Sequence, residues 1–406
     1  DLCKRKAFEY RCRLILFKQE DTMFKLHYFN GTLSPGFVAL FSGRMIQFFA
    51  TGLIGLFLPI YLLKQFEHNV IFVLAYFLIG HLIYALIVPL GARFLNRIGL
   101  RRSLRMSIFF DASFYICMFF LPFNPTFFLL LSVIFITLCR VTFWLPFHVD
   151  FAKFTDKLNR GKEVSIFWAA KSLLGIAIPI ASGLLITYYG FNIVFVLAVI
   201  LFLAAGIPFL ALPKTHEGFS WTYSETVKNF FAKENRKLVI ANMANGAEND
   251  VAIVIWPIFI WQIMEGNYIA TGILSSMIVF VTVILQLAVG KYTDTMDKRK
   301  MLHWGSVLYA TGWFAKAFIL TAFQTFVVGA YHSFAQIFKD TPFDALNYEM
   351  LADRGHYVDE YTVVKEMAVQ SGKVLVLSLA IIVTLFAGLN WTFFLAALAT
   401  LLINLL

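Results

Sequence analysis

Long apolar runs constrain the fold of this chain more than any other feature of its sequence. An α-helix needs about 20 apolar residues to cross the hydrocarbon core of a bilayer. Twelve runs of roughly this length occur, near residues 37–63, 69–91, 104–122, 126–148, 164–188, 191–212, 237–263, 268–290, 301–322, 325–348, 360–387 and 391–406. With 60% hydrophobic and 14% charged residues, the 406-residue chain holds more apolar surface than a soluble protein of its size can bury. The sequence therefore predicts an all-α polytopic membrane protein with twelve transmembrane helices.

The placement of basic residues predicts the orientation of the chain. Connections after the second, fourth, sixth, eighth and tenth runs are polar and mostly basic, whereas those after the third, fifth, seventh, ninth and eleventh contain no Lys or Arg. Because cytoplasmic loops carry an excess of Lys and Arg, both termini are expected in the cytoplasm, with the plasma (inner) membrane as the location. The net charge is +10, but the cations are spread over short loops, which argues against nucleic-acid binding.

A polar stretch after the sixth run divides the chain into two sets of six helices. The expected parts are a cytoplasmic N-terminal stretch (1–33), an N-terminal six-helix bundle (34–212), a cytoplasmic linker (213–236) and a C-terminal six-helix bundle (237–406). Met23 offers a more natural start than Asp1, so residues 1–22 are expected not to be native. The last run stops with the sequence, and we expect a truncated carboxyl end.

An internal repeat supports the division into two sets. Arg160-Gly161 precedes Lys171 by eleven residues, and Arg354-Gly355 precedes Lys365 by the same interval, at an offset of 194 residues. Internal repeats of this kind are typical of transporters built from two related halves.

Two loops share a pattern at corresponding places of the two halves. The loop after the second run reads Ala92-Arg-Phe-Leu-Asn96-Arg97-Ile-Gly99-Leu-Arg101-Arg102, and the loop after the eighth reads Gly290-Lys-Tyr-Thr-Asp294-Thr-Met-Asp297-Lys298-Arg299-Lys300. Both resemble the Gly-x-Leu-Ala-Asp-Arg-x-Gly-Arg-Arg signature of the Major Facilitator Superfamily. Together with the twelve runs, the resemblance covers nearly the whole chain. It implies two pseudo-symmetric six-helix bundles that move a solute by alternating access.

The resemblance also implies a cytoplasmic gate in these loops. In the family the acidic residue lies against the N-terminus of a neighbouring helix, where free amides favour an anion, and the arginines bridge the two halves. The matching residues here are Asn96, Arg97, Gly99, Arg101, Gly290, Asp294 and Arg299. Asn96 replaces the acid in the first half and keeps only a side-chain acceptor for an amide, so the expectation of a gate rests more on Asp294.

Polar side chains recur at helical spacing within several apolar runs. A charged group in a bilayer costs about 2.5 to 3.5 kcal/mol on insertion scales, so such groups are expected to face a lumen or a partner. The resemblance places runs one, four, seven and ten around a central cavity, and it likens Arg140 to an intramembrane arginine linked to proton coupling. The candidate substrate-binding or coupling residues are Arg44, Gln47, Arg140, Lys171, Asn245, Glu248, Asn249, Asp250, His332, Gln336, Asp340, Lys365 and Gln370.

A second interpretation is that the charges pair across helices without contacting a ligand. The pairs considered are Arg44 with Glu248, Lys171 with Asp340 or Asp344, and Arg140 with Asp111. His81, a lone histidine in the second run, is interpreted as a hydrogen-bonded packing residue.

We therefore expect a secondary active transporter of a small organic solute, with proton coupling through a buried carboxylate or imidazole. The excess of cations favours an anionic or sugar-like solute. An efflux antiporter for amphipathic compounds is the alternative, because Trp144, Trp256, Trp261 and Phe338 could line an aromatic cavity. A non-transporting sensor or scaffold on the same fold is the alternative from another class.

Enzymatic motifs do not occur in the sequence. There is no HExxH, no G-x-S-x-G, no P-loop and no Cys/His cluster, so we expect no enzyme activity, no metal and no cofactor. The expected partners are the solute, protons and the lipid bilayer, and the protein is expected to be a monomer.

Overall fold

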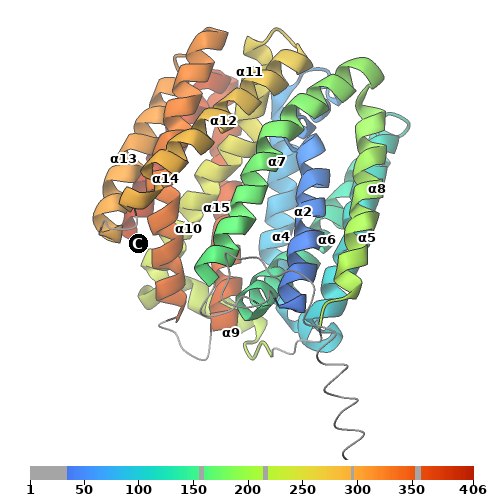
Figure 1. Ribbon diagram of the computed structural model, residues 1–406, viewed down its shortest axis with the longest axis vertical. Helices are drawn as coiled ribbons and strands as arrows, with labels where there is room; N and C mark the ends of the chain where they lie inside the picture. Colours follow the sequence, from blue (N-terminus) through green and yellow to red (C-terminus); the bar gives the residue numbers. More distant parts are fainter. Residues whose placement is uncertain (1–33, 155–159, 214–217, 294–296, 353–357) are drawn as a thin grey trace, which may run out of the picture.

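The computed structural model describes residues 34–154, 160–213, 218–293, 297–352 and 358–406. Within these residues the chain is helical and contains no strand. Most helices run side by side along the longest axis of the molecule (Figure 1). The predicted residues 1–33, Asp294, Arg354 and Gly355 lie outside the described part of the chain.

The first half of the chain forms six helical segments. The first segment consists of α2 and α3, which Leu56 and Phe57 separate. The bounds are α2 Pro35–Gly55, α3 Leu58–Gln65, α4 Val70–Ile98, α5 Leu100–Phe120, α6 Pro125–Phe154, α7 Arg160–Tyr189 and α8 Phe191–Leu210.

The second half forms six further segments after a short linker helix. The linker contains α9 (Tyr223–Phe231) and η2 (Lys233–Asn235). The later elements are α10 Arg236–Asp250, the π-helix η3 Val251–Ile255, α11 Trp256–Ile263, α12 Tyr268–Thr293, α13 Lys298–Lys316, α14 Ala322–Ala352, α15 Val358–Phe386, η5 Leu389–Trp391, α16 Thr392–Leu402 and η6 Ile403–Leu405. Taking α10, η3 and α11 as one segment, and η5, α16 and η6 as another, each predicted run coincides with one segment, which confirms the predicted fold class.

Local sequence signals set several helix ends. Ser34 caps α2 by accepting from the Phe37 amide, and Pro35 occupies the first helical position, where the missing N–H costs nothing. Asn69 caps α4 in the same way. Gly99, with φ of 82°, ends α4 and starts α5, a backbone conformation that favours glycine. The capping residues explain why the helices begin within a few residues of the predicted runs.

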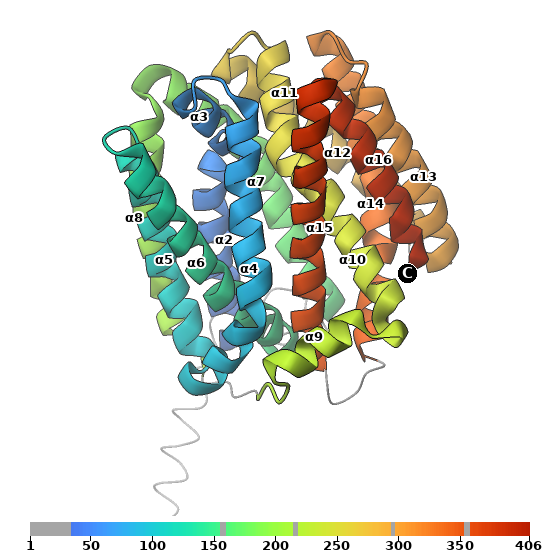
Figure 2. The same ribbon diagram turned by 180° about the vertical axis from the view of Figure 1, so that it is seen from behind.

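The two halves pack through corresponding helices. Contacts between the halves join α4 to α15 and α7 to α12. Within the halves, the packing of α2 against α8 corresponds to that of α10 against α16. The packing of α5 against α6 likewise corresponds to that of α13 against α14. Figure 1 shows α7 beside α12, and Figure 2 shows α4 beside α15 on the opposite side. The arrangement is that of two pseudo-symmetric bundles with a shared interface.

The linker helix α9 lies across one end of the bundles (Figure 2). We call this the linker end and the opposite one the far end. Toward the far end the halves are joined by apolar packing, in which Phe57 meets Tyr268 edge-on with ring centroids 5.9 Å apart. A Cβ on Gly183 of α7 or on Gly272 of α12 would run into the backbone of the other helix. Glycine at these positions is therefore what allows α7 and α12 to touch.

Among the residues that the structure describes, eight helices are long and apolar enough to cross a membrane: all six segments of the first half, and α12 and α15 of the second. Of the remaining four segments, that of α16 is shorter, while α10, α13 and α14 carry charges such as Glu248, Lys316 and Lys339. The second half thus keeps the architecture of the first with more polar interiors.

Candidate functional site

A set of five polar residues joins the two halves of the molecule, and we call it the cross-half network. His81 of α4 and Arg140 of α6 belong to the first half; Asp250 of α10, Gln370 and Lys373 of α15 belong to the second. His81 Nε2 lies 3.1 Å from Asp250 Oδ1, and His81 Nδ1 lies 2.7 Å from Gln370 Oε1 and 3.3 Å from Arg140 Nη1. Lys373 Nζ lies 3.5 Å from the same Asp250 oxygen. With His81 3% and Asp250 1% exposed, the network is buried between the halves.

The proton on His81 determines which contacts this network makes. When His81 is neutral, its Nε2–H donates to Asp250 and its Nδ1 accepts from Arg140. Nδ1 also accepts from Gln370 Nε2 once the Gln370 amide group is rotated by 180°, so that its nitrogen faces the imidazole. In protonated His81, Nδ1–H donates to Gln370 Oε1 and repels the Arg140 guanidinium, which has no acceptor. One proton therefore removes the contact with Arg140, which lies in the same half, and reverses the direction of the hydrogen bond to Gln370 across the halves.

Helical geometry separates the two buried acids of α10. Glu248 and Asp250 are two residues apart, which at about 100° per residue places them on nearly opposite sides of the helix. Asp250 faces His81 in the first half, and Glu248 faces α14 within its own half. The π-helix η3 follows Asp250 directly, a local widening that is frequent at functional sites.

A second polar cluster lies inside the C-terminal bundle, and we call it the Glu248 cluster. Lys339, 1% exposed, forms an ion pair with Glu248 and another with Asp340, whose oxygen is 2.7 Å away. The Tyr309 hydroxyl donates to Glu248 Oε2 at 2.9 Å. Gln336 Nε2 donates to Asp340 Oδ2 at 2.8 Å, while the Asp340 side chain is 41% exposed. One lysine thus neutralises two carboxylates, one buried and one in contact with solvent.

Two of the predicted ion pairs are wrong. Glu248 of α10 pairs with Lys339 of α14 and not with Arg44 of α2. Asp111 accepts a hydrogen bond from Cys139 Sγ at 2.8 Å, and within the described residues no ion pair joins it to Arg140. Pairing of buried charges was the right expectation, but sequence did not identify the partners.

Arg44 lies among aromatic rings of α6. Its guanidinium carbon is 4.9 Å from the ring centroid of Phe143, 5.3 Å from that of Trp144 and 5.5 Å from that of Phe147. Among the described residues, Arg44 makes no hydrogen bond or ion pair with another side chain. Gln47, one turn further along α2, is 1% exposed, and its Oε1 has no partner in the part of the chain that is described. A guanidinium framed by rings, beside an unused amide oxygen, can receive a carboxylate.

The other candidate residues take different places. Asn245 accepts from Lys339 Nζ at 3.3 Å and belongs to the Glu248 cluster. Lys171 Nζ lies 5.4 Å from the ring centroid of Phe48. Asn249 and Lys365 are half-buried on α10 and α15. His332 is buried in α14 against Tyr309 and Lys316.

The first-half gate loop holds the linker rather than the other half directly. Asn96 Oδ1 accepts from the Phe219 amide at 2.8 Å, and Asn96 Nδ2 donates to the Phe219 carbonyl at 2.7 Å. Asparagine, unlike aspartate, can both accept and donate, which matches the two backbone groups of one residue. The expected acceptor role is therefore met by the linker, and an additional donor role appears.

The arginines of this loop contact their own half. Arg101 Nη1 donates to the Leu212 carbonyl at 3.3 Å, and Arg105 donates to the carbonyls of Phe209 and Leu210 at the end of α8. These contacts satisfy orphan carbonyls at a helix C-terminus. Where its contacts are described, Arg101 thus does not bridge the halves as the resemblance implied, and Arg97 is exposed.

The connection between halves at the linker end runs through residues Phe219 and Ser220, which we call the linker strap. Glu360 of α15, 4% exposed, accepts from the Ser220 amide at 2.8 Å and from its hydroxyl at 2.7 Å. Asn96 of α4 holds the adjacent residue Phe219. The strap therefore ties together the ends of α4 and α15, the pair of helices that meets at the interface.

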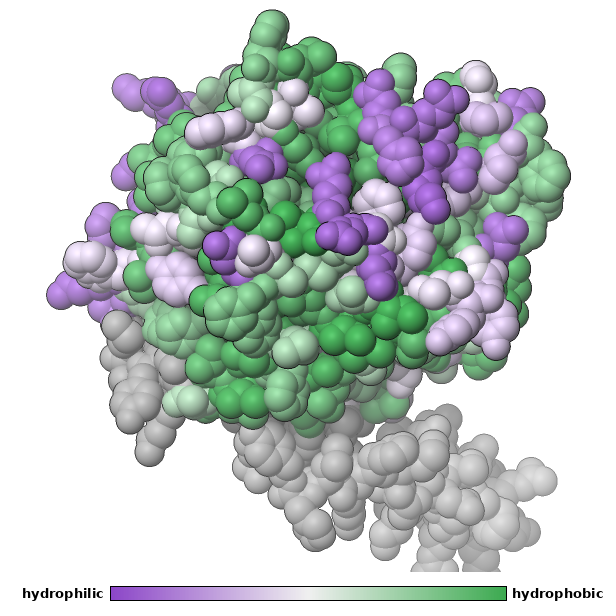
Figure 3. Space-filling view, turned by 90° about the horizontal axis from the view of Figure 1, so that it is seen from above, coloured by the Kyte–Doolittle hydropathy of each residue, from purple (hydrophilic) through white to green (hydrophobic). Residues whose placement is uncertain are grey.

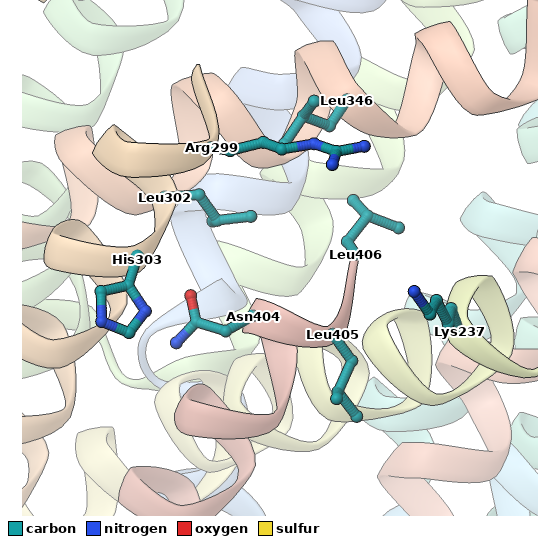
Figure 4. Close-up of a pocket in the computed structure, with 8 residues that line it drawn as sticks. All are labelled: Lys237, Arg299, Leu302, His303, Leu346, Asn404, Leu405 and Leu406. Atoms are coloured by element: carbon teal, nitrogen blue, oxygen red, sulfur yellow. The ribbon is translucent and has the colours of Figure 1, made fainter. Parts of the chain in front are cut away.

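The surface of the second half carries a separate pocket at the linker end. It has a volume of about 180 Å³ and is lined in part by Lys237, Arg299 and His303 (Figure 4). Arg299 is the one gate candidate in its lining; the gate residue Gly290 lies within α12. At the far end, hydrophilic residues gather on part of a mainly hydrophobic surface (Figure 3). Neither feature includes the cross-half network.

Sequence reasoning missed several members of the two polar sets. His81 was interpreted as a hydrogen-bonded packing histidine, and it is buried and hydrogen-bonded, but its partners Asp250, Gln370 and Arg140 were not predicted. Lys339 is adjacent to the candidate Asp340, and Lys373 lies three residues after the candidate Gln370, so their positions in polar helices were a usable signal. Nothing in the sequence marks Tyr309, because a tyrosine in an apolar helix is ordinary.

Comparisons with known proteins agree with this architecture. The sequence model of the Major Facilitator Superfamily matches residues 40–235. A sequence comparison with curated proteins finds no match. A crystal structure of a POT family transporter in complex with 5-aminolevulinic acid is similar over 92% of this chain and 95% of that chain, with a TM-score of 0.71 and 12% identity. A crystal structure of the peptide transporter POT, a glutamate-to-glutamine variant in complex with sulfate, is similar over 92% and 93%, with a TM-score of 0.68 and 13% identity.

At these identities the solved structures establish the fold alone. The family match covers most of the first half, and the fold match extends over the second. Helices apolar enough to span a membrane occur in both halves. Residues 40–235 therefore match the Major Facilitator Superfamily, and the described chain has the fold of the two solved POT transporters and several helices apolar enough to cross a membrane.

Proposed function

We propose that this protein is a proton-coupled secondary transporter of small organic solutes that carry a carboxylate. The observation that carries the proposal is the buried contact of His81 with Asp250 and Gln370, which joins the two halves through a titratable group. Alternating access requires the halves to move relative to each other around a central site. A proton that changes a contact between the halves can therefore couple its own movement to that motion.

The preference for a carboxylate is inferred from Arg44. Its guanidinium offers a planar fork of donors that matches a carboxylate in two parallel hydrogen bonds. Phe143 and Trp144 of α6 lie beside it, and a carboxylate of the solute would supply the hydrogen-bond acceptors for its donors. Lys171 of α7 and the solvent-accessible Asp340 of α14 supply further polar groups, and an amino group of the solute would suit Asp340. This inference favours amino-acid-like or peptide-like solutes over sugars.

The topology follows from the charges at the two ends. Arg93, Arg97 and Arg102 are exposed at the linker end, as are Lys298 and Lys300. By the positive-inside rule the linker end is cytoplasmic, and both termini are assigned to that side. We assign residues 34–212 and 237–406 as the two moving bundles, 213–236 as the linker, and the plasma (inner) membrane as the location of a monomeric transporter.

Uptake into proteoliposomes tests the proposal. Radiolabelled 5-aminolevulinic acid, which a solved structure of similar fold binds, is the first probe, followed by a panel of dipeptides, monocarboxylates and monosaccharides. With a gradient of one pH unit, coupling to one proton permits accumulation of up to about tenfold. Replacing His81 by glutamine is expected to abolish gradient-driven accumulation while exchange of solute across the membrane at equal pH continues.

His68→Gln is the matched control. His68 lies in the same half but is exposed at the far end, stacked on Trp261 with centroids 6.0 Å apart. It should leave accumulation unchanged. Arg44→Lys keeps the charge but removes the fork, and it should raise the KM for carboxylate solutes more than for sugars. No flux of any panel solute by the wild-type protein would overturn the proposal.

Efflux of amphipathic compounds is the second candidate, since Phe143, Trp144 and Phe147 surround Arg44 with apolar surface. Proton-driven export of a lipophilic cation from inverted vesicles, without uptake of carboxylates, would favour that function. Binding of a solute without any transport would instead favour a sensor on the same fold.

A further inference from the structure

A buried lysine occupies the far end of α13. Lys316 is the last residue of this helix and is 2% exposed. Its Nζ lies 3.9 Å from the ring centroid of Trp313 and 4.1 Å from that of Trp256. No carboxylate of the described residues forms an ion pair with it. The two rings and the C-terminal end of the helix favour a cation at this place, but without a counter-ion.

The partner of Lys316 is a second titratable side chain. Lys316 Nζ lies 3.0 Å from Nδ1 of His332, which is 4% exposed. At this distance one nitrogen must donate and the other must accept, so the pair holds one proton between the two atoms. A second proton would place two positive charges side by side in a buried site, which is strongly unfavourable. Lys316 and His332 therefore form a unit that carries either one positive charge or none.

This unit adjoins the Glu248 cluster. The His332 ring is stacked on Tyr309, with centroids 4.0 Å apart and 25° between planes, and the Tyr309 hydroxyl donates to Glu248 at 2.9 Å. Trp313 meets the His332 ring edge-on at 4.4 Å. A Cβ on Gly312 would lie 2.7 Å from His332 Cδ2, so glycine at this position allows α13 to pack against the His332 ring. His332 is thus held at a fixed place one ring away from the hydrogen-bonded acid.

The charges around the unit nearly cancel. α10 presents Glu248, α14 presents Lys339 and Asp340, α13 presents Tyr309, and α16 contains no titratable residue. Lys339 and a charged Lys316–His332 unit balance the two ionised carboxylates. If Glu248 takes up a proton, the group has an excess positive charge, and release of the proton from Lys316–His332 restores the balance.

We propose that Lys316 and His332 form a second proton-binding site, linked to Glu248, that is loaded and emptied during the transport cycle. The step is a proton transfer only: a proton leaves Nζ or Nδ1 for water as Glu248 gains one, and returns as Glu248 loses it. The inference rests on the proposed proton coupling and adds to it a site separate from His81. His332 was a candidate from sequence; Lys316 was not.

Tryptophan fluorescence tests the site without any solute. Trp313 and Trp256 contact the unit, and a nearby imidazolium or ammonium quenches indole emission. Wild-type protein in detergent is expected to show a step in emission as the pH is varied over the range in which the protein stays folded. The step should vanish in Lys316→Arg, since arginine keeps its proton throughout and holds His332 neutral. It should move to a different pH in Lys316→Met, where His332 titrates without its partner, and it should shrink when Trp313 is replaced by phenylalanine. An identical step in wild type and both Lys316 variants would overturn the inference.

Lys64→Met is the matched control, because Lys64 also lies over an aromatic ring at the far end, 5.4 Å from Tyr268, but is exposed. It should keep the step. Lys316→Arg further separates proton exchange from a structural role. If Lys316 serves only as a fixed cation, the variant should keep proton-driven uptake of 5-aminolevulinic acid. If Lys316 exchanges a proton, the variant should lose the accumulation of up to about tenfold per pH unit.

The two proposals fail in different ways. A fluorescence step that depends on Lys316, in a protein that transports no panel solute, would overturn the proposed function and leave the proton site standing. Proton-driven uptake that His81→Gln abolishes and Lys316→Arg leaves intact would overturn the second site and leave the function standing.

Discussion

The two halves of this protein share one arrangement of helices but differ in what their interiors contain. All six segments of the first half are apolar enough to span a membrane, against two in the second. The second half instead buries the Glu248 cluster and the Lys316–His332 unit. Because a buried charge is tolerated only when paired, the extra charges of the second half require a precise set of partners. The first half supplies a scaffold and, in the cross-half network, the buried His81 that contacts Asp250.

The largest expected effect comes from removing Lys339. Lys339→Met leaves Glu248 and Asp340 without their cation, and breaking a buried pair in this way costs about 3 to 5 kcal/mol. In the first half, Asp111→Asn removes a carboxylate bonded to Cys139 and should cost about 1 kcal/mol. Thermal unfolding in detergent measures both. Adding Glu248→Gln to Lys339→Met should restore part of the loss, and equal destabilisation by the two single variants would show that the halves do not differ in this respect.

Corresponding helix crossings sharpen the comparison. In the second half, a Cβ on Gly246 or Gly372 would enter the backbone of the facing helix at the crossing of α10 and α15. At the crossing of α2 and α7 in the first half, a Cβ on Gly52 would meet the Ile178 side chain, whose Cδ1 lies at 2.9 Å and can rotate away. Gly372→Ala should therefore cost about 1 to 3 kcal/mol and Gly52→Ala less.

Gly55→Ala is the control for helix propensity, because nothing lies within 4 Å of the place that its added methyl group would occupy. It should not destabilise the protein in the same unfolding assay. A larger loss for Gly52→Ala than for Gly372→Ala would contradict the view that the second half is the more tightly constrained.

The helices could be predicted from sequence because each depends on a local property. Apolar length predicted every segment, although charges lowered the signal in α13 and α14. The site was predicted only as a set of residue types. Glu248 and Asp250 were recognised as unusual, but their partners Lys339 and His81 are 91 and 169 residues away in sequence, and only packing brings them together. A pattern along one helix cannot specify a pairing between helices.

Substitutions in the residues that hold the linker strap are expected to have a smaller effect on stability than those in the helix crossings. Glu360→Gln keeps an oxygen that can accept from Ser220 but removes the negative charge from both hydrogen bonds. Asn96→Asp keeps its bond to the Phe219 amide and loses the one to the carbonyl. Charge-assisted bonds are roughly twice as strong as neutral ones. A loss of about 1 kcal/mol for Asn96→Asp corresponds to about fivefold more of the detached linker, and Glu360→Gln should exceed it.

Limited trypsin digestion measures detachment, because Lys228 lies in α9 directly after the strap. Arg97→Gln is a suitable control, since Arg97 is exposed beside Asn96. If cleavage at Lys228 rises equally in Arg97→Gln and Asn96→Asp, the strap does not depend on the Asn96 hydrogen bonds.

The smallest effect concerns α9, which belongs to neither half. Glu225 Oε2 accepts from the Thr222 amide at 2.6 Å, and this capping box holds the pKa of Glu225 below its usual range. A lowered carboxylate pKa contributes stability that is present above the unfolded value and is lost as the pH falls through the folded value. The first turn of α9 should therefore loosen only under acidic conditions, and Glu225→Gln should remove this dependence. Hydrogen exchange of residues 223–231, compared between wild type and variant across pH, measures it. If the first turn of α9 still loosens at low pH in Glu225→Gln, the pH response comes from the bundles and not from the capping box. In that case α9 could not serve as a reference, independent of both halves, for comparing them.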